Sequence, residues 1–336
     1  MKKRIGKQTV RFDKKVYIKG SAAICGTKEN EGPIGSDFDI IMPDAEWNEE
    51  TWEKTESKMQ REAVKLAVQK AGLNLFDIEY IFAGDLLNQC IGAGFGLREL
   101  DIPFFGVYGA CSTMIESLSL SAAMIDGGFA DNTAAVTSSH FCTAERQYRT
   151  PLAYGGQRTP TAQWTVTGAG ALVLSSNGTG PYITEITTGK ICDMGVKDAN
   201  NMGGAMAPAA YDTLLAHFKD SSKKPSDYDL ILTGDLGKVG REILIELIAK
   251  DGYDISKNYN DCGCMIYDLQ EQDVHAGGSG CGCIASVLCG HILKRMNNGE
   301  LKNVLAIGTG ALLSPTSSLQ GESVPGIAHA AAIHCE

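Results

Sequence analysis

One cysteine occupies a position at which thiols often become reactive. Cys111 follows the stretch 107–110 and opens a helical pattern that runs to Asp126. Backbone N–H groups and the helix dipole at such a position lower the pKa of a thiol, and nearby amides can hold an oxyanion. Cys111 is therefore a candidate nucleophile. The alternative is a small buried residue that fills a tight junction between a strand and a helix.

Two histidines lie near the ends of expected elements. His140 ends the stretch 133–140, and the carboxyl ends of parallel strands face the ligand crevice. We expect His140 to bond a ligand or to act as an acid or base, unless it bonds only a neighbouring loop. His275 precedes the Gly-rich loop 277–280. Such a loop can cradle phosphate, but no P-loop lysine or dinucleotide fingerprint surrounds it.

A stretch rich in arginine and tyrosine follows His140. Residues 142–160 include Arg146, Tyr148, Arg149 and Arg158. A long loop after a strand that ends at the crevice is expected to cover it as a lid. Arginine binds carboxylates with two parallel hydrogen bonds, so the stretch favours a small acidic ligand. At least one of these arginines is expected to pair with a surface acid instead.

The cysteines raise the question of a metal. Cys262 with Cys264, and Cys281 with Cys283, form two C-x-C pairs. This spacing is less typical of zinc than C-x₂-C, and both pairs adjoin expected core elements. We therefore expect no metal and no cofactor, with a zinc site as the alternative. An odd total of 11 cysteines, without an export signal, is typical of reduced core thiols.

Charge and hydropathy exclude several classes of protein. The net charge of −10 argues against nucleic acid as a partner. Apolar runs end well short of the ~20 residues of a membrane span, and the stretch 5–12 is too polar for a signal peptide. Residues 1–20 form a basic arm. It either docks on the acidic body, which we favour, or is attracted to an anionic membrane surface.

An internal repeat predicts the elements that position these residues. The stretch 77–85 returns as 227–235, each with an acidic lead-in, a short apolar run and a Gly-Asp end. This pattern is typical of a buried strand in a parallel sheet. Helical patterns precede the two copies, at residues 51–71 and 206–219.

A second pair of segments repeats in the same order. The helical pattern that begins at Cys111 has a counterpart at 283–296, and strand patterns follow the two, at 133–137 and 304–308. The sequence therefore predicts a pseudo-symmetric α/β protein with halves 1–176 and 177–336. Such proteins tend to place their site where the halves meet, which would bring His275 toward Cys111.

These features resemble a known superfamily. The two similar halves, the cysteine at the start of a central helix and the Gly-rich strand 167–174 are similar to thiolases and ketoacyl synthases. Over its whole length the chain resembles one branch, the stage V sporulation protein AD family, most clearly at 20–26, 106–113 and 273–283. The resemblance implies two βαβαβαββ halves in a layered α-β-α-β-α core.

The resemblance also implies a function. Condensing enzymes of the superfamily carry an acyl group on the cysteine that matches Cys111, assisted by two polar partners. One partner normally follows the stretch 230–233, where this chain has Asp235 but no His or Asn. Near the other partner's position only His275 is close. The sporulation family implies binding of dipicolinic acid, with or without calcium, beside membrane proteins of the same assembly.

We therefore expect a thiolase-like pocket that binds dipicolinic acid without condensing acyl groups. The expected ligand-binding residues combine the candidates above: Cys111, His140, Arg146, Tyr148, Arg149, Asp235 and His275. The rival is an active acyltransferase with Cys111 as nucleophile and His275 or His140 as base, and a third hypothesis is a scaffold with an empty pocket. The resemblance also implies a peripheral place on the cytoplasmic side of the spore inner membrane, and a homodimer.

Overall fold

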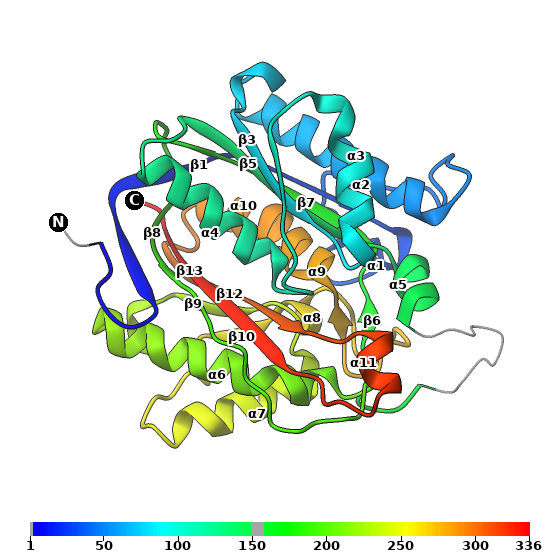
Figure 1. The fold of residues 1–336 in the computed structure, drawn as a ribbon. Coiled ribbons are helices and arrows are strands. Elements are labelled where there is room, and N and C mark those ends of the chain that lie inside the picture. The colour runs from blue at the N-terminus through cyan, green and yellow to red at the C-terminus, as the bar shows by residue number, and fades with distance from the viewer. Residues whose placement is uncertain (1–2, 149–157) are drawn as a thin grey trace.

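Two half-sheets of the same topology form the centre of the molecule. We analysed a computed structural model, which describes residues 3–148 and 158–336 (Figure 1). The strand order is β4-β3-β5-β7-β1 in the first half-sheet and β10-β9-β12-β13-β8 in the second. Antiparallel pairing of β1 with β8 joins them into one continuous sheet. The first half-sheet contains β1 (Thr9–Cys25), β3 (Tyr80–Gly84), β4 (Phe104–Gly106), β5 (Asn132–Ser139) and β7 (Gly168–Ser175). The second contains β8 (Tyr182–Thr187), β9 (Leu230–Thr233), β10 (Tyr259–Asp261), β12 (Asn303–Ala311) and β13 (Gly326–His334).

The predicted repeat corresponds to matching strands. β3 pairs in parallel with β4 and β5, and β9 pairs in parallel with β10 and β12. A short 3-10 turn precedes each strand, ending at Asp77 in one half and at Asp227 in the other. After the first residue of each strand, the apolar residues of both strands are buried, as expected for parallel strands covered on both faces. The expected boundary at residue 176 falls in the turn between β7 and β8.

Helices form three layers around the two half-sheets (Figure 1). The middle layer contains α4 (Thr113–Asp126) and a second helix that runs as α9 (Cys281–Ser286), a π-helical segment (Val287–Ile292) and α10 (Leu293–Asn297). The first half-sheet is covered outside by α2 (Trp52–Lys70) and α3 (Ile91–Leu97), and the second by α6 (Met202–Ser221) and α7 (Gly237–Ala249). The layers run α-β-α-β-α, which confirms the expected fold class.

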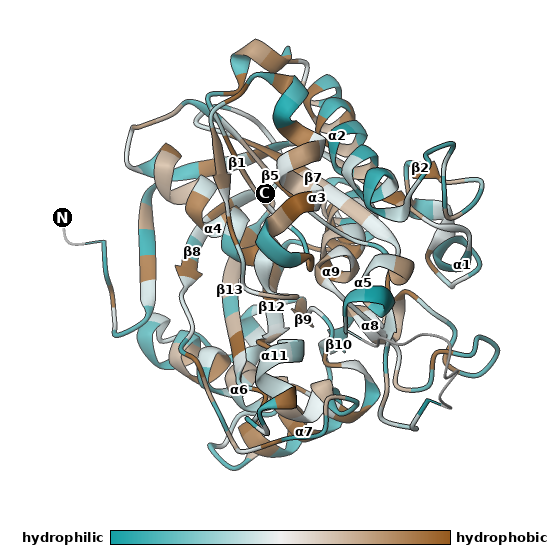
Figure 2. Cartoon of the chain, turned by 45° about the vertical axis from the view of Figure 1, so that its right-hand side comes forward, coloured by the Kyte–Doolittle hydropathy of each residue, from teal (hydrophilic) through white to brown (hydrophobic). Residues whose placement is uncertain are grey.

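Each boundary between layers has its own hydrophobic core. The middle core contains Leu118 and Ile284 from the two central helices, packed between the half-sheets. A second core lies under α2 and α3, and a third under α6 and α7. Figure 2 shows the corresponding pattern, because the outer helices carry hydrophilic residues among hydrophobic ones. No helix in the described part of the chain is long and apolar enough to span a membrane.

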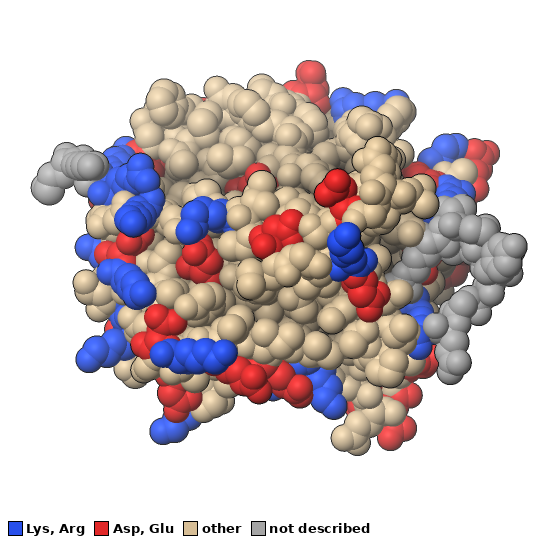
Figure 3. All heavy atoms as spheres, turned by 60° about the horizontal axis from the view of Figure 1, so that its bottom comes forward, with Lys and Arg blue, Asp and Glu red and all other residues tan. Residues whose placement is uncertain are grey.

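The basic segment 1–20 is mostly a strand rather than a free arm. From Thr9 onward it belongs to β1, where its backbone pairs with β7 and β8. Arg11 lies 2.7 Å from Glu185, and Lys3 lies 2.6 Å from Asp126. The second of these acids also accepts hydrogen bonds from the backbone of residues 13 and 14. These ion pairs agree with docking on the acidic body. On the face seen in Figure 3, basic and acidic side chains are interspersed.

The structure differs in one respect from the predicted lid loop 142–160. Its first part is a helix, α5 (Phe141–Tyr148), rather than a loop. Ala144, Glu145, Arg146 and Gln147 are good helix formers, and Thr143 donates a 2.7 Å hydrogen bond to the buried Glu56 of α2. The remainder of the predicted loop up to residue 157, including Arg149, lies outside the described residues.

Candidate functional site

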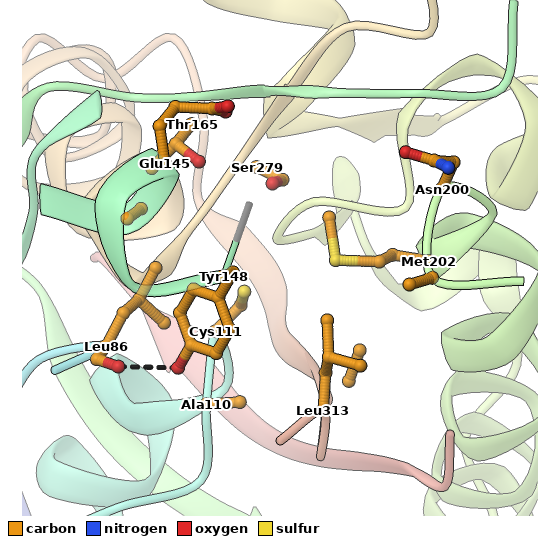
Figure 4. Close-up of a pocket in the computed structure, with 13 residues that line it drawn as sticks. Leu86, Ala110, Cys111, Glu145, Tyr148, Thr165, Asn200, Met202, Ser279 and Leu313 are labelled. Carbon is orange, nitrogen blue, oxygen red and sulfur yellow. Dashed lines mark hydrogen bonds between the residues drawn. The ribbon is translucent and has the colours of Figure 1, made fainter. Parts of the chain in front are cut away.

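A cavity of about 220 Å³ lies above Cys111, near the carboxyl ends of the parallel strands. Figure 4 shows Tyr148 beside Cys111 on one side of it and Asn200 with Met202 on the other. Segments from both halves therefore enclose the cavity, as expected for a pseudo-symmetric protein. The lining residues are Leu86, Ala110, Cys111, Ala144, Glu145, Tyr148, Thr165, Ala199, Asn200, Met202, Ser279, Ala311 and Leu313.

Cys111 lies in the turn that leads into α4. Ala110 has a φ of 51°, in the left-handed region that non-glycine residues rarely adopt. The helix begins two residues later, at Thr113. The thiol is therefore not in the first turn of the helix, where the dipole acts most strongly. Burial and the nearby Asp235 carboxyl raise the pKa of Cys111 well above its usual value. This reverses the lowered pKa expected from the sequence.

Asp235 is the polar side chain that this protein has after β9, where the resemblance implied a catalytic His or Asn. It directly follows Gly234, after the end of β9, and is completely buried. Its carboxylate accepts hydrogen bonds from Thr309 Oγ1 at 2.6 Å and from the Gly280 backbone N–H at 3.2 Å. It also interacts with the Cys111 thiol. Burial raises the pKa of Asp235 to about 7, although the hydrogen bonds from Cys111 and Thr309 lower it.

Tyr148 forms one wall of the cavity and is held from two directions. Its hydroxyl donates a 2.6 Å hydrogen bond to the Leu86 carbonyl and lies 3.2 Å from the Tyr108 hydroxyl. Burial is the main cause of its raised pKa. Tyr148 therefore presents a neutral aromatic ring to the cavity, on which a flat ligand can stack.

The structure does not bring the two predicted histidines to the cavity. His140 Nε2 lies 2.9 Å from the Ala45 carbonyl, and its Nδ1 accepts the Cys142 backbone N–H at 3.1 Å. Burial lowers the pKa of His140. It lines a separate cavity of about 140 Å³ with Lys28 and Trp164. The structure therefore agrees with the alternative for His140, a histidine that bonds a neighbouring loop.

His275 also does not line the cavity above Cys111. Its Nε2 lies 3.3 Å from the carboxylate of Asp273, and the side chain is partly exposed. Its backbone has a φ of 51°. It lies on a turn, before Gly277–Gly280 continue into the site, so Ser279 rather than His275 lines the cavity. The pseudo-symmetry of the halves predicted correctly that the loop 277–280 reaches the cavity. It did not predict that His275, just before this loop, stays outside.

Neither of the two described arginines of this stretch, Arg146 and Arg158, lines the cavity. Arg146 pairs with Glu53 and lies over the Trp52 ring, about half exposed and outside the cavity lining. Arg158 pairs at 3.1 Å with Glu145, which does line the cavity. Arg158 thus contacts the wall of the site through Glu145.

Several lining residues could not be predicted from the sequence. Asn200 and Met202 lie just before and at the start of α6, and Thr165 lies on the short strand Trp164–Thr165. None of them belongs to a motif. The pseudo-symmetry of the halves was the one available signal, since it marked the loop that contains Ser279.

Of the paired cysteines, Cys262, Cys281 and Cys283 are buried in the core, and Cys264 is partly exposed. Cys281 Sγ donates to the Ser138 carbonyl at 2.8 Å, and Cys283 Sγ to the Gly234 carbonyl at 3.4 Å. Burial raises the pKa of both thiols. Within residues 3–148 and 158–336, no group of three or more His, Cys, Asp or Glu is arranged to hold a metal ion.

Comparison with known proteins defines the class first. A variant of OleA from Xanthomonas campestris is similar in structure, with a TM-score of 0.65 at 14% identity, over 96% of this chain and 97% of that one. The 3-oxoacyl-[acyl-carrier-protein] synthase III from Aquifex aeolicus VF5 gives a TM-score of 0.56 at 13% identity, over 95% and 99%. The fold is that of the thiolase and ketoacyl synthase superfamily.

Sequence comparison then defines the branch. The model of the family "Stage V sporulation protein AD" matches residues 6–334. The chain is 47% identical to stage V sporulation protein AD of Bacillus subtilis (strain 168) over 324 residues, which are 96% of each chain. The chain belongs to the stage V sporulation protein AD family.

Proposed function

We propose that the protein binds dipicolinic acid, alone or as its calcium chelate, in the cavity above Cys111 and does not transform it. The observation that carries this proposal is a cavity at the Cys111 position whose surroundings suit binding better than catalysis. The cavity of about 220 Å³ lies below the ~300–1,000 Å³ of sites for drug-sized ligands. A molecule with one aromatic ring suits that size.

The lining offers both of the contacts that a flat diacid needs. Tyr148, Leu313 and Met202 supply an aromatic ring and apolar walls. Thr165, Ser279 and Asn200 supply hydroxyl and amide groups that can donate to carboxylate oxygens. A ring between the apolar walls would place its two carboxyl groups toward these donors.

Charge determines which form of the ligand fits. Glu145 is the charged side chain among the described lining residues, and Arg158 balances it at 3.1 Å. Among the described lining residues, a bare dianion would therefore meet neutral donors. Calcium would lower the charge of the ligand, and the Glu145 carboxylate offers the oxygen chemistry that calcium prefers. Titration with dipicolinate in calcium and in chelator distinguishes the two forms.

The rival hypothesis, acyl transfer, is favoured by the superfamily fold. Condensation needs a base and donors for the developing enolate. The described lining residues include no histidine, and Cys111 has a raised pKa. Incubation with acyl-CoA followed by mass spectrometry tests this rival. A Cys111 thioester that turns over to product would replace binding by catalysis.

Calorimetric titration with dipicolinate tests the proposal directly. We expect Tyr148→Leu and Asn200→Ala to weaken binding by ~10-fold or more, since one such contact contributes about 1.4 kcal/mol or more. Arg146→Ala is the control, because Arg146 lies on the same helix but outside the lining, and it should bind within twofold of wild type. Unchanged affinity in both lining variants would reject this cavity, and no binding by the wild type would favour the scaffold hypothesis.

Membership of the sporulation family supports a proposal on where the protein acts. We propose that it acts at the cytoplasmic side of the spore inner membrane, beside membrane proteins of the same sporulation assembly. Cosedimentation with anionic lipid vesicles tests direct membrane contact. Binding that disappears when Lys7, Lys14 and Lys19 are replaced by Gln would support contact through the basic segment.

A further inference from the structure

A second cavity adjoins the one above Cys111. This outer cavity has a volume of about 250 Å³ and is lined by residues of the turns that follow β3 and β12. Among its lining residues Tyr108 is 45% exposed, whereas Cys111 in the inner cavity is 5% exposed, so the outer cavity lies nearer to the surface. Tyr148 and Leu313, both labelled in Figure 4, line both cavities. These two side chains therefore form a wall between them.

Hydrogen bonds hold the Tyr148 ring in this wall. The Leu86 carbonyl accepts the Tyr148 hydroxyl at 2.6 Å and the Gln147 side-chain amide at 2.9 Å. The side-chain oxygen of Gln147 accepts the Asn88 backbone N–H at 2.9 Å. From the outer cavity, the Tyr108 hydroxyl lies 3.2 Å from that of Tyr148. The end of α5 is thus fixed against the turn after β3, and the ring has little freedom to move aside.

The outer cavity could accommodate a carbon chain. Its lining includes the apolar side chains of Leu87, Leu312, Leu313 and Pro315, next to the rings of Tyr108 and Tyr148. Methylene groups gain free energy when such side chains remove them from water. A chain whose acid group lay above Cys111 could reach this apolar lining only past the position of the Tyr148 ring. The ring therefore separates a small inner site from space that would suit a longer ligand.

We propose that Tyr148 determines the ligand class of the site, because its ring closes the cavity above Cys111 toward the outer cavity and so excludes long acyl chains. This inference rests on the binding function proposed above, since it names the residue that limits the ligand to a small flat acid. It also states how a protein with the fold of acyl-condensing enzymes can reject their long-chain ligands. The selection is one of length and shape, in addition to the stacking contact of the same ring.

Calorimetric titration with hexanoate, octanoate and decanoate tests this limit. In the wild type we expect the affinity to stay within about threefold along the series, because added carbons find no space. In Tyr148→Ala the affinity should rise by up to ~4-fold for each added CH₂ that is buried, and by ~30-fold or more from hexanoate to decanoate. Tyr148→Leu keeps a good helix former at this position and should give a smaller rise in the same direction.

Tyr108→Ala is the matched control. It makes the same change of side chain in the outer cavity but leaves the Tyr148 ring and its bond to Leu86 in place. We expect the chain-length series of this variant to resemble that of the wild type.

Three results would overturn the proposal: a wild type whose affinity already rises with chain length, a flat series in both Tyr148 variants, or an equal rise in Tyr108→Ala. Dipicolinate is titrated separately. Failure of the wild type to bind it would reject the proposed ligand, whereas the alkanoate series would still report whether Tyr148 closes the inner cavity.

Discussion

Buried titratable side chains make the stability of this protein depend on pH in two opposite ways. Burial raises the pKa of Asp235 to about 7 and also raises that of Glu56, which lies close to Asp85. The folded state therefore keeps protons that the unfolded chain releases near pH 4. Burial lowers the pKa of His217 and His329 to about 4, so the unfolded chain binds protons below pH 6.5 that the folded state refuses.

We therefore predict that the free energy of unfolding falls as pH rises from about 7.5 to 8.5. In that window the histidines are almost entirely neutral in both states, and stability decreases because only the folded state still holds acid protons. The loss is at most ~1.4 kcal/mol per pH unit for each retained proton. Urea unfolding at pH 7.5, 8.0 and 8.5 measures it. Asp235→Asn should reduce the slope, whereas Asp254→Asn, an exposed control, should not. A slope that is zero or positive in the wild type would contradict this prediction.

At the level of elements, α9 packs closely against β7. A Cβ added at Gly170 of β7 would lie 2.2 Å from the Ala285 carbonyl oxygen of α9. Gly94, on the exposed face of α3, would gain a Cβ with no atom within 4 Å. The same substitution therefore has opposite consequences at the two positions.

Gly170→Ala is expected to destabilise the protein by ~1–3 kcal/mol, because the central helix must move away from the sheet. Gly94→Ala is expected to stabilise it by ~0.5–1 kcal/mol, since alanine loses less backbone entropy in a helix. Chemical denaturation of both variants beside the wild type measures the difference. Equal effects at the two positions would mean that α9 does not approach β7 as closely as described.

The strands and central helices could be predicted from the sequence because each has a strong local signal. The short buried runs in β3 and β9 end in the same Gly-Asp pair, and the repeat doubled that signal. The helix α5 was missed because the adjacent arginines and tyrosine favoured a loop. Its helix formers and the Thr143 contact with Glu56 decide otherwise.

Side-chain direction limited the prediction of the site. His140 does follow β5 at the expected end, yet its ring bonds the Ala45 carbonyl in a neighbouring cavity. Successive side chains in a strand point to opposite faces, so an error of one residue changes the cavity that a side chain enters. Asn200 reaches the cavity through the path of the chain between β8 and α6, which no local pattern encodes.

At the scale of the whole molecule, the end of the sheet formed by β4 exposes aromatic side chains. The outermost strand of the first half, β4, pairs on one side with β3, and no strand of the described residues pairs with its other edge. Phe104 and Phe105 of this strand are 43% and 48% exposed, and Phe95 of the nearby α3 is 58% exposed. An open edge with exposed aromatic rings favours association with another strand.

We predict that a homodimer, as expected from the superfamily resemblance, forms through this edge. A two-fold axis would place β4 beside its copy in a second chain and bury the aromatic rings of both. Analytical ultracentrifugation at micromolar concentration should show a dimer for the wild type and a monomer for Phe104→Glu. Leu319→Glu, which alters an exposed residue of α11 (Pro315–Leu319), should remain dimeric. A monomeric wild type would contradict the prediction.

The central claim is that the cavity above Cys111 binds dipicolinic acid, and a crystal structure of the complex tests it most directly. We predict density for one planar ligand between Tyr148 and Met202, with carboxylate oxygens within hydrogen-bond distance of Ser279 or Asn200. The Cys111 sulfur should lie beside the ligand without a covalent bond to it. Ligand density in the cavity of His140 and Trp164 instead, or a covalent adduct on Cys111, would contradict the account.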